Sequence, residues 1–291
     1  MTGLSDLPIG IYEKALPDTL SLTEKLLLAK EAGYDFLEIS IDESDERLKR
    51  LDWSKAERLE LVGVLLMHDM RISTMCFSAQ RRFPFGSHDP AIRQQAKELM
   101  RKALEFAVDV GIRTIQLAGY DVFYESGDRT TVGFFLEGLR YATHLAAHWH
   151  VMLALETMDT TFMDSVAKCL WARQQVPSPW LSVYPDLGNL HAWHGMCWQE
   201  LALGKNSMVA LHVKETIGKS AIYPGKFRDL LYGQGDVEFA GFFRVLREMG
   251  YAGTFVLEFW HGPACDATYP YRALRWMKEQ LALCDALENE G

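Results

Sequence analysis

The sequence has little cysteine, no excess of basic residues and no long apolar run. Its five cysteines are scattered and lack CxxC spacing, which argues against a disulfide framework and a structural zinc site. A formal net charge of −9 argues against a general nucleic-acid or membrane-surface binder. No stretch approaches the roughly 18 apolar residues of a membrane span, and the N-terminus lacks a basic region followed by an apolar run. We therefore expect a cytoplasmic protein without nucleic-acid or membrane partners.

What the sequence does contain is a regular alternation of strand-like and helix-like segments over 291 residues. Eight short, mostly apolar runs have the character of buried strands: 8–12, 35–40, 71–78, 114–119, 151–157, 181–186, 208–215 and 254–260. Amphipathic stretches that predict helices lie at 22–32, 55–68, 89–110, 131–148, 164–173, 198–203, 239–249 and 271–287. Several end in glycine before the next strand, as in EAGYDF and EMGYAG.

This alternation predicts parallel strand–helix units, and eight of them predict a (β/α)8 TIM barrel, an α/β fold. The main alternative is an open doubly wound sheet, but no GxGxxG follows the first strand. We see no low-complexity linker or shift in composition. The expectation is one barrel domain over residues 1–291.

Polar residues close four consecutive strands in the second half of the chain. They are Glu156 in LALET, Asp186 in SVYPD, His212 in ALHVK and Glu258 in FVLEF. Because the carboxyl ends of barrel strands share one rim, these side chains are expected to meet there. The alternative is that each acid separately caps a helix or forms a salt bridge, which is common for one strand-end acid but less so for four in succession.

Three carboxylates and an imidazole suit a divalent transition ion such as Mn²⁺, Co²⁺ or Zn²⁺, and the set has too few oxygens to favour Ca²⁺. Without a cation the acids would repel one another, and some would stay protonated. The sequence therefore predicts a metal held by Glu156, Asp186, His212 and Glu258.

Five longer stretches of the sequence are distinctive: PIGIYEKALP, DERLKRLDWS, MRKALEFAVDVGIRTIQLAGYDVFYE, YPDLGNLHAW and AxHVKET. They resemble the L-ribulose-5-phosphate (L-xylulose-5-phosphate) 3-epimerases of bacterial L-ascorbate catabolism, which belong to the xylose-isomerase-like barrel superfamily. The resemblance runs nearly end to end. It departs at Gln80, where the family pattern has histidine, and in HGPACDATYP after the eighth strand. It implies a metal-dependent sugar-phosphate 3-epimerase, the same four ligands and a homodimer.

The implied reaction removes a proton beside a carbonyl and returns it on the other face, so it needs two bases and stabilisation of oxygen charge. We assign the bases to Glu156 and Glu258. Asn189 and Lys214, close after predicted ligands, are candidates for substrate hydroxyls, although each is equally suited to a structural role.

Arg81 and Arg82, in a loop after the third strand, offer donors for a phosphate dianion. A solvated surface pair is the alternative. Other functions considered are an abasic-site endonuclease of the same superfamily, a related sugar isomerase and a non-catalytic sugar-phosphate sensor. The endonuclease would need more strand-end histidines and a basic face.

Overall fold

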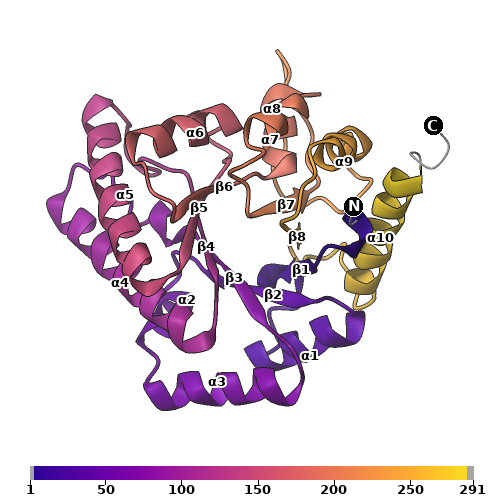
Figure 1. The fold of residues 1–291 in the computed structure, drawn as a ribbon, viewed down its shortest axis with the longest axis horizontal. Helices are drawn as coiled ribbons and strands as arrows, with labels where there is room; N and C mark the ends of the chain where they lie inside the picture. The colour runs from indigo at the N-terminus through magenta and orange to yellow at the C-terminus, as the bar shows by residue number, and fades with distance from the viewer. Residues whose placement is uncertain (1–2, 287–291) are drawn as a thin grey trace.

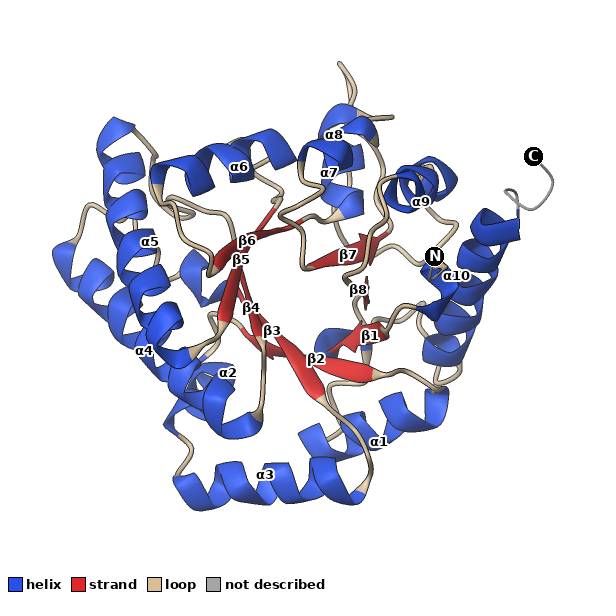
Figure 2. Ribbon diagram, in the orientation of Figure 1, coloured by secondary structure: helices blue, strands red, loops and turns tan. Residues whose placement is uncertain are grey.

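The computed structural model of the chain describes residues 3–286. Eight strands form one parallel sheet curled into a barrel (Figure 1, Figure 2). They are β1 Ile9–Tyr12, β2 Phe36–Ile41, β3 Ile72–Phe77, β4 Thr114–Leu117, β5 Met152–Glu156, β6 Leu181–Tyr184, β7 Ala210–Lys214 and β8 Thr254–Glu258. The predicted TIM barrel is confirmed.

The order of the strands is β6-β5-β4-β3-β2-β1-β8-β7. Because β1 pairs with both β2 and β8, the sheet is not the open, doubly wound alternative. The barrel closes between β6 and β7 through two isolated parallel bridges, Val183 to Met208 and Asp186 to His212. This seam has fewer paired residues than the other junctions, and it lies at the residues of the predicted metal site.

Helices surround the strands in a ring (Figure 2). The α-helices are α1 Leu22–Ala32, α2 Asp45–Leu48, α3 Lys55–Met67, α4 Pro90–Val110, α5 Arg129–Trp149, α6 Val166–Gln175, α7 Leu187–His194, α8 Gln199–Leu203, α9 Phe239–Glu248 and α10 Tyr269–Ala286. Short 3-10 helices are η1 Leu4–Asp6, η2 Glu13–Ala15, η3 Lys49–Asp52 and η4 Ser78–Arg81.

Local sequence explains where these helices begin and end. Ser21 and Ser54 start α1 and α3 with capping boxes, each receiving the backbone N–H of a glutamate three residues later. Gly33 and Gly111 end α1 and α4 with φ of 95° and 89°, a left-handed conformation that glycine adopts without a Cβ penalty.

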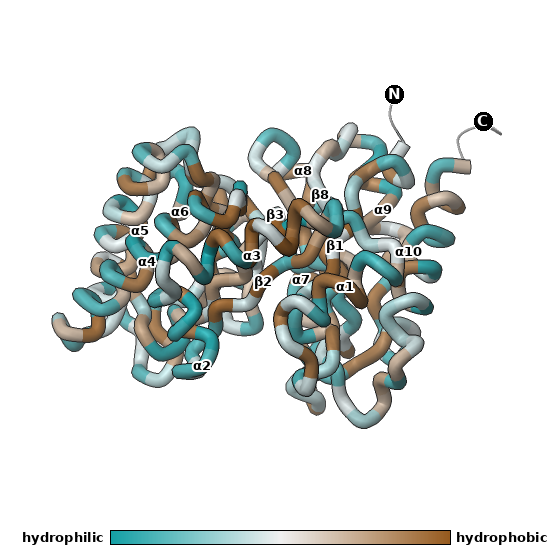
Figure 3. The backbone as a smooth tube through the Cα atoms, turned by 90° about the horizontal axis from the view of Figure 1, so that it is seen from below, coloured by the Kyte–Doolittle hydropathy of each residue, from teal (hydrophilic) through white to brown (hydrophobic). Residues whose placement is uncertain are grey.

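The main core lies between the strands and the helices, where apolar residues from both are buried. Figure 3 shows strands β1, β2, β3 and β8 as largely hydrophobic, whereas the surrounding helices alternate in character. A second, smaller cluster includes Tyr12, Phe36 and Tyr184. The Tyr184 ring lies 4.8 Å from the ring of His212, so this cluster packs directly against the predicted site.

All eight predicted strands are present, with ends shifted by a few residues. Two short helices, α2 and α7, were not expected. The predicted last helix reaches Leu287, which lies outside the described residues. Within residues 3–286, no helix is both long and apolar enough to cross a membrane.

Candidate active site

Four polar side chains meet where the last four strands end. Glu156 and Glu258 are the final residues of β5 and β8, Asp186 follows β6, and His212 lies within β7. Each offers one ligand atom, and these atoms all lie within 4.8 Å of one another. The structure thus brings together the four residues that the sequence singled out.

The imidazole of His212 lies at the centre of this group. Its Nδ1 is 2.8 Å from Glu156 Oε1, 3.2 Å from Glu258 Oε2 and 4.0 Å from Asp186 Oδ2. On one side lies Lys214, whose Nζ is 2.7 Å from Asp186 Oδ2 and 3.6 Å from Glu258 Oε2. All five side chains are buried, so solvent does little to screen their charges.

This burial changes the acidity of the carboxyl groups. Burial raises the pKa of Asp186 to about 8, although the charge of Lys214 opposes the shift. Burial likewise raises the pKa of Glu156. It also acts to raise the pKa of Glu258, but there Lys214 and His212 outweigh it and hold that pKa well below its usual value. Three acids share one ammonium and one imidazole, so the group favours an additional positive charge.

A glutamate from the opposite half of the barrel orients His212. The imidazole Nε2 lies 2.6 Å from Glu38 Oε1, and the other oxygen of Glu38 accepts the Tyr184 hydroxyl at 2.8 Å. The hydrogen bond to Glu38 orients the ring so that Nδ1 faces the three acids, where it can become a ligand once a cation takes the place of its proton. Sequence reasoning did not identify Glu38 as this acceptor. The signal was present, because Glu38 interrupts the apolar strand DFLEIS.

Gln116 on β4 holds Glu156 from the other side. Its Nε2 donates a hydrogen bond to Glu156 Oε2, and the side chain is fully buried. Its Oε1 has no hydrogen-bond partner among the described residues. Sequence reasoning took TIQLAG only as a strand and missed this contact, because a lone glutamine in a strand carries no chemical pattern.

The four residues fit a divalent transition ion. They offer three carboxylates and one oriented imidazole nitrogen, a mixed set suited to Mn²⁺, Co²⁺ or Zn²⁺. Among the described residues, Asp186 Oδ2 and Glu258 Oε2 are buried and accept no hydrogen bond of good geometry, although both lie near the ammonium group of Lys214. A cation bound between them would satisfy both oxygens and remove the repulsion.

A pocket opens above this group. Its lining includes Glu156, Glu258, Asn189, Lys214 and Trp260. Asn189 accepts a hydrogen bond from Lys214 Nζ at 2.8 Å and donates one to the Thr157 carbonyl oxygen at 2.8 Å. The two candidate substrate-binding residues are therefore in the pocket and bonded to each other.

The two arginines after β3 point in different directions. Arg81 lines the pocket, with its guanidinium 3.3 Å from the Tyr120 hydroxyl. Arg82 is exposed and forms an ion pair with Asp45 at 2.7 Å. Arg81 is the last residue of η4 and Arg82 lies just beyond it, and adjacent residues on such a tight turn point away from each other. The structure therefore separates the predicted pair and leaves Arg82 outside the pocket.

A second arginine reaches the pocket from a loop that carries no recognisable motif. Arg228 lies between β7 and α9, and its Nη2 is 2.7 Å from Asp159 Oδ2. The Tyr120 hydroxyl donates to the other oxygen of Asp159 at 2.5 Å. Together with Arg81, these residues form a chain of contacts at the pocket mouth. Sequence reasoning missed Arg228, because nothing in KFRDLL indicates which way the loop folds.

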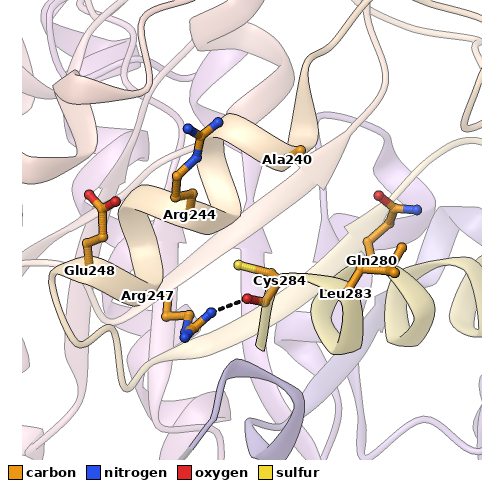
Figure 4. A pocket seen from close by; sticks show the side chains of 7 residues that line it. All are labelled: Ala240, Arg244, Arg247, Glu248, Gln280, Leu283 and Cys284. Atoms are coloured by element: carbon orange, nitrogen blue, oxygen red, sulfur yellow. Dashed lines mark hydrogen bonds between the residues drawn. The ribbon is translucent and has the colours of Figure 1, made fainter. Parts of the chain in front are cut away.

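Another hollow lies on the outside of the barrel between α9 and α10 (Figure 4). Its lining includes Ala240, Leu283 and Cys284, whose carbonyl oxygen accepts a hydrogen bond from Arg247. None of the predicted site residues lies there. Its polar residues, Arg244, Arg247, Glu248 and Gln280, lie on outer helices rather than at strand ends, so we place the chemistry at the pocket inside the barrel.

Comparison with known proteins agrees with this architecture. The model of the xylose isomerase-like TIM barrel family matches residues 26–280. The fold and the site thus define a barrel of the xylose isomerase-like class. A solved structure described as L-ribulose 3-epimerase superposes with a TM-score of 0.78 at 14% identity, covering 97% of each chain, which supports the fold alone.

Curated relatives define the family more narrowly. A putative L-ribulose-5-phosphate 3-epimerase, SgbU, of Escherichia coli strain K12 is 48% identical over 94% of this chain and 96% of that protein. L-ribulose-5-phosphate 3-epimerase UlaE of Shigella boydii serotype 18 is 44% identical over 97% of this chain and 98% of that protein. The chain belongs to the L-ribulose-5-phosphate 3-epimerase family, and it is an isomerase.

Proposed function

We propose that the protein inverts C3 of a ketopentose 5-phosphate, interconverting L-ribulose 5-phosphate and L-xylulose 5-phosphate. The names of relatives at 44–48% identity support the substrate class. The observation that carries the chemistry is the buried group of Glu156, Asp186, His212 and Glu258 at the pocket floor. It combines two bases with a place for a cation.

Each part of this group has a role. A divalent ion held by the four residues would act as a Lewis acid toward the oxygen charge that develops when the C3 proton leaves. Glu156 and Glu258 come from strands that are not adjacent in the sheet and serve as the bases, one on each face of C3. One carboxylate takes the proton, and the other, in its acid form, returns a proton to the opposite face. Asp186 and His212 serve as ligands only.

Neighbouring side chains keep the two bases in place. Gln116 fixes Glu156 through its amide, so that one carboxylate oxygen stays directed at the pocket. Lys214, 3.6 Å from Glu258 Oε2, favours the ionised form of that base. Asn189 and Lys214 also offer an amide and an ammonium group to the substrate hydroxyls and carbonyl.

For the phosphate we propose Arg81 together with Arg228 and Lys14, three cations among the residues lining the pocket. This proposal replaces the sequence-based expectation that Arg81 and Arg82 together bind the phosphate. Arg81→Ala is expected to raise KM for the phosphorylated sugar about tenfold or more, as loss of one charge-assisted contact does. Arg82→Ala, the matched control, is expected to leave KM unchanged, and an equal effect of both would contradict the assignment.

The test of the reaction is proton exchange at C3. Incubated with L-xylulose 5-phosphate in D₂O, the metal-loaded enzyme should introduce deuterium at C3. Glu156→Gln and Glu258→Gln should each abolish epimerisation while retaining a fold, and Glu60→Gln, on the exposed face of α3, should behave as the parent. A Gln variant of either base that epimerises at the parental rate would remove its role, and a parent that never exchanges would favour a sugar-phosphate sensor.

We also propose that residues 1–291 form one barrel domain and that the protein works in the cytoplasm as a homodimer. The nearly end-to-end family resemblance supports the domain and the dimer, and the sequence composition supports the compartment. Light scattering of the purified enzyme tests the dimer.

A further inference from the structure

The loop between β7 and α9 is tied to the barrel by a buried carboxylate next to the site. Glu215 directly follows Lys214 and is 3% exposed. Since successive residues of an extended strand point to opposite sides, Lys214 faces the pocket and Glu215 faces the loop. Glu215 is not among the residues that line the pocket. Its burial therefore requires an explanation other than contact with substrate.

That explanation is a set of backbone N–H groups from both ends of the loop. Glu215 Oε1 accepts from the N–H of Thr216 at 3.2 Å and of Val237 at 3.3 Å, and Oε2 accepts from Gly233 at 2.8 Å. The carboxylate thus joins the first residue of the loop to its last turn. Hydrogen bonds to a charged acceptor are among the stronger ones in proteins, which makes this a firm closure.

Steric constraint supports the same interpretation. A Cβ added to Gly235 would lie 2.5 Å from Glu215 Oε1 and 2.1 Å from the carbonyl oxygen of Thr216. Only glycine allows the backbone to approach the carboxylate this closely. On the outer side, Asp236 adds a second closure by contacting His191 Nε2 and the N–H of Gly218, both at 2.9 Å.

Between these closures the loop carries Arg228 to the mouth of the pocket. There the guanidinium contacts Asp159 and lies 5.7 Å from the centre of the Trp260 ring. Residues 217–232 have little regular structure of their own, apart from the pairing of Ile217 with Lys226. The direction of Arg228 therefore depends on how firmly the loop is closed at its base.

We infer that Glu215 is a positioning residue that holds Arg228 in place for the phosphate end of the substrate. The inference rests on the proposed function. It deepens that function, because Glu215 would contribute to recognition of the phosphorylated sugar by positioning Arg228, without touching the sugar itself. Freed from Glu215, the loop would spend less time with Arg228 at the mouth, and phosphate affinity would fall while the chemistry at C3 would not.

Glu215→Gln is the central variant. The amide has nearly the same size, but its NH₂ faces backbone donors where a carboxylate oxygen had accepted. We expect KM for L-xylulose 5-phosphate to rise about tenfold, with kcat and bound metal unchanged, as loss of about 1.4 kcal/mol of binding predicts. Turnover of unphosphorylated L-xylulose should not change. A fall in kcat, or equal losses for both sugars, would overturn the inference.

A double-mutant cycle separates positioning from general stability. In an Arg228→Ala background, Glu215→Gln should have little further effect on KM, because the group it positions is absent. Additive losses would show that Glu215 acts elsewhere. Should Glu215→Gln fail to fold, Asp236→Asn loosens the same loop base from a half-exposed position and is expected to raise KM in the same direction.

Binding of inorganic phosphate distinguishes failure of this inference from failure of the proposed function. Calorimetry on the metal-loaded parent and on Glu215→Gln requires no turnover. A tenfold weaker phosphate affinity in the variant supports the inference even if the parent epimerises no ketopentose phosphate. Equal affinities in the two proteins overturn it, even if the parent is an active epimerase.

Discussion

Each half of the barrel buries an acid near a strand end, Glu13 in the first half and Asp186 in the second, and the charges of these two acids are balanced in opposite ways. In the first half Glu13, just after β1, lies 2.5 Å from Arg47 and 2.6 Å from Arg50. Although its burial acts to raise the pKa, the two arginines lower it to about 2. In the second half burial raises the pKa of Asp186 to about 8. A buried acid that arginines neutralise is structural, whereas one without enough cations marks a site for a ligand.

Removing the metal should have the largest effect of the changes considered, and the effect should be on turnover. A chelator is expected to lower turnover about a thousandfold, because Lewis-acid stabilisation is worth several kcal/mol. Mn²⁺ or Co²⁺ should restore the activity, and elemental analysis should follow the metal. The Glu13 cluster needs no cation of this kind. Full activity in chelated, metal-free protein would remove the distinction between the halves.

The variant Glu13→Gln tests whether the buried acid in the first half of the barrel is structural. We expect the free energy of unfolding to fall by about 3–5 kcal/mol, because Arg50 would be left without its buried counter-charge and Arg47 would keep only its longer contacts with Asp42 and Asp18. Metal content and kcat should stay near parental values in the folded fraction. Urea unfolding measures the free energy of unfolding, elemental analysis measures the metal content, and steady-state kinetics measure kcat. Loss of metal without loss of stability would reverse the assignment of the two clusters.

The ion pairs of Glu13 with Arg47 and Arg50 also predict how the stability of the fold depends on pH. The pKa of Glu13 is about 2 in the folded protein and about 4.3 in an unfolded chain. A lowered pKa stabilises the fold above the unfolded value, so about 3 kcal/mol is lost as pH falls from about 5 to about 2. Urea unfolding at pH 7, 5 and 3 should show the gap between parent and Glu13→Gln shrinking with acidity. A constant gap would mean that Glu13 is not ionised in the fold.

The variant Glu38→Gln should have a smaller effect, a loss of metal affinity. Replacing the group that orients a ligating histidine lowers metal affinity about 10–100-fold. Titration of the metal-free variant with Mn²⁺ measures it, and Tyr184→Phe, which removes only the hydroxyl contact with Glu38, is the milder companion. Unchanged affinity in Glu38→Gln would show that His212 is held by the barrel backbone alone.

The smallest effect concerns stability without metal. Burial raises the pKa of Glu156 in the fold, so its ionised form weakens the metal-free protein at neutral pH. Glu156→Gln should therefore be at least as stable as the parent when both are chelated, opposite in sign to Glu13→Gln. With metal bound the order should reverse. Thermal unfolding with and without Mn²⁺ decides, and a chelated variant less stable than its parent would count against this interpretation.

The sequence was most informative where regular periodicity governed the structure. Strand spacing predicted the barrel, and polar residues at strand ends predicted the four residues that meet at the rim. Glu38 and Gln116 were missed because they lie inside strands, where one polar residue resembles many others. The orientation of Arg82 and the path to Arg228 depend on loop folding. Helix α7 was missed because it is short and its N-cap, Asp186, was assigned to the end of a strand.

The seam between β6 and β7 gives the metal site a further significance. The barrel is closed there by bridges rather than a full ladder, and one bridge joins Asp186 to His212. A cation shared by these two side chains would join β6 to β7 where the barrel has its fewest paired residues. Amide exchange along β6 and β7 should then slow when Mn²⁺ binds. Metal binding would thereby stabilise the barrel as well as support its chemistry.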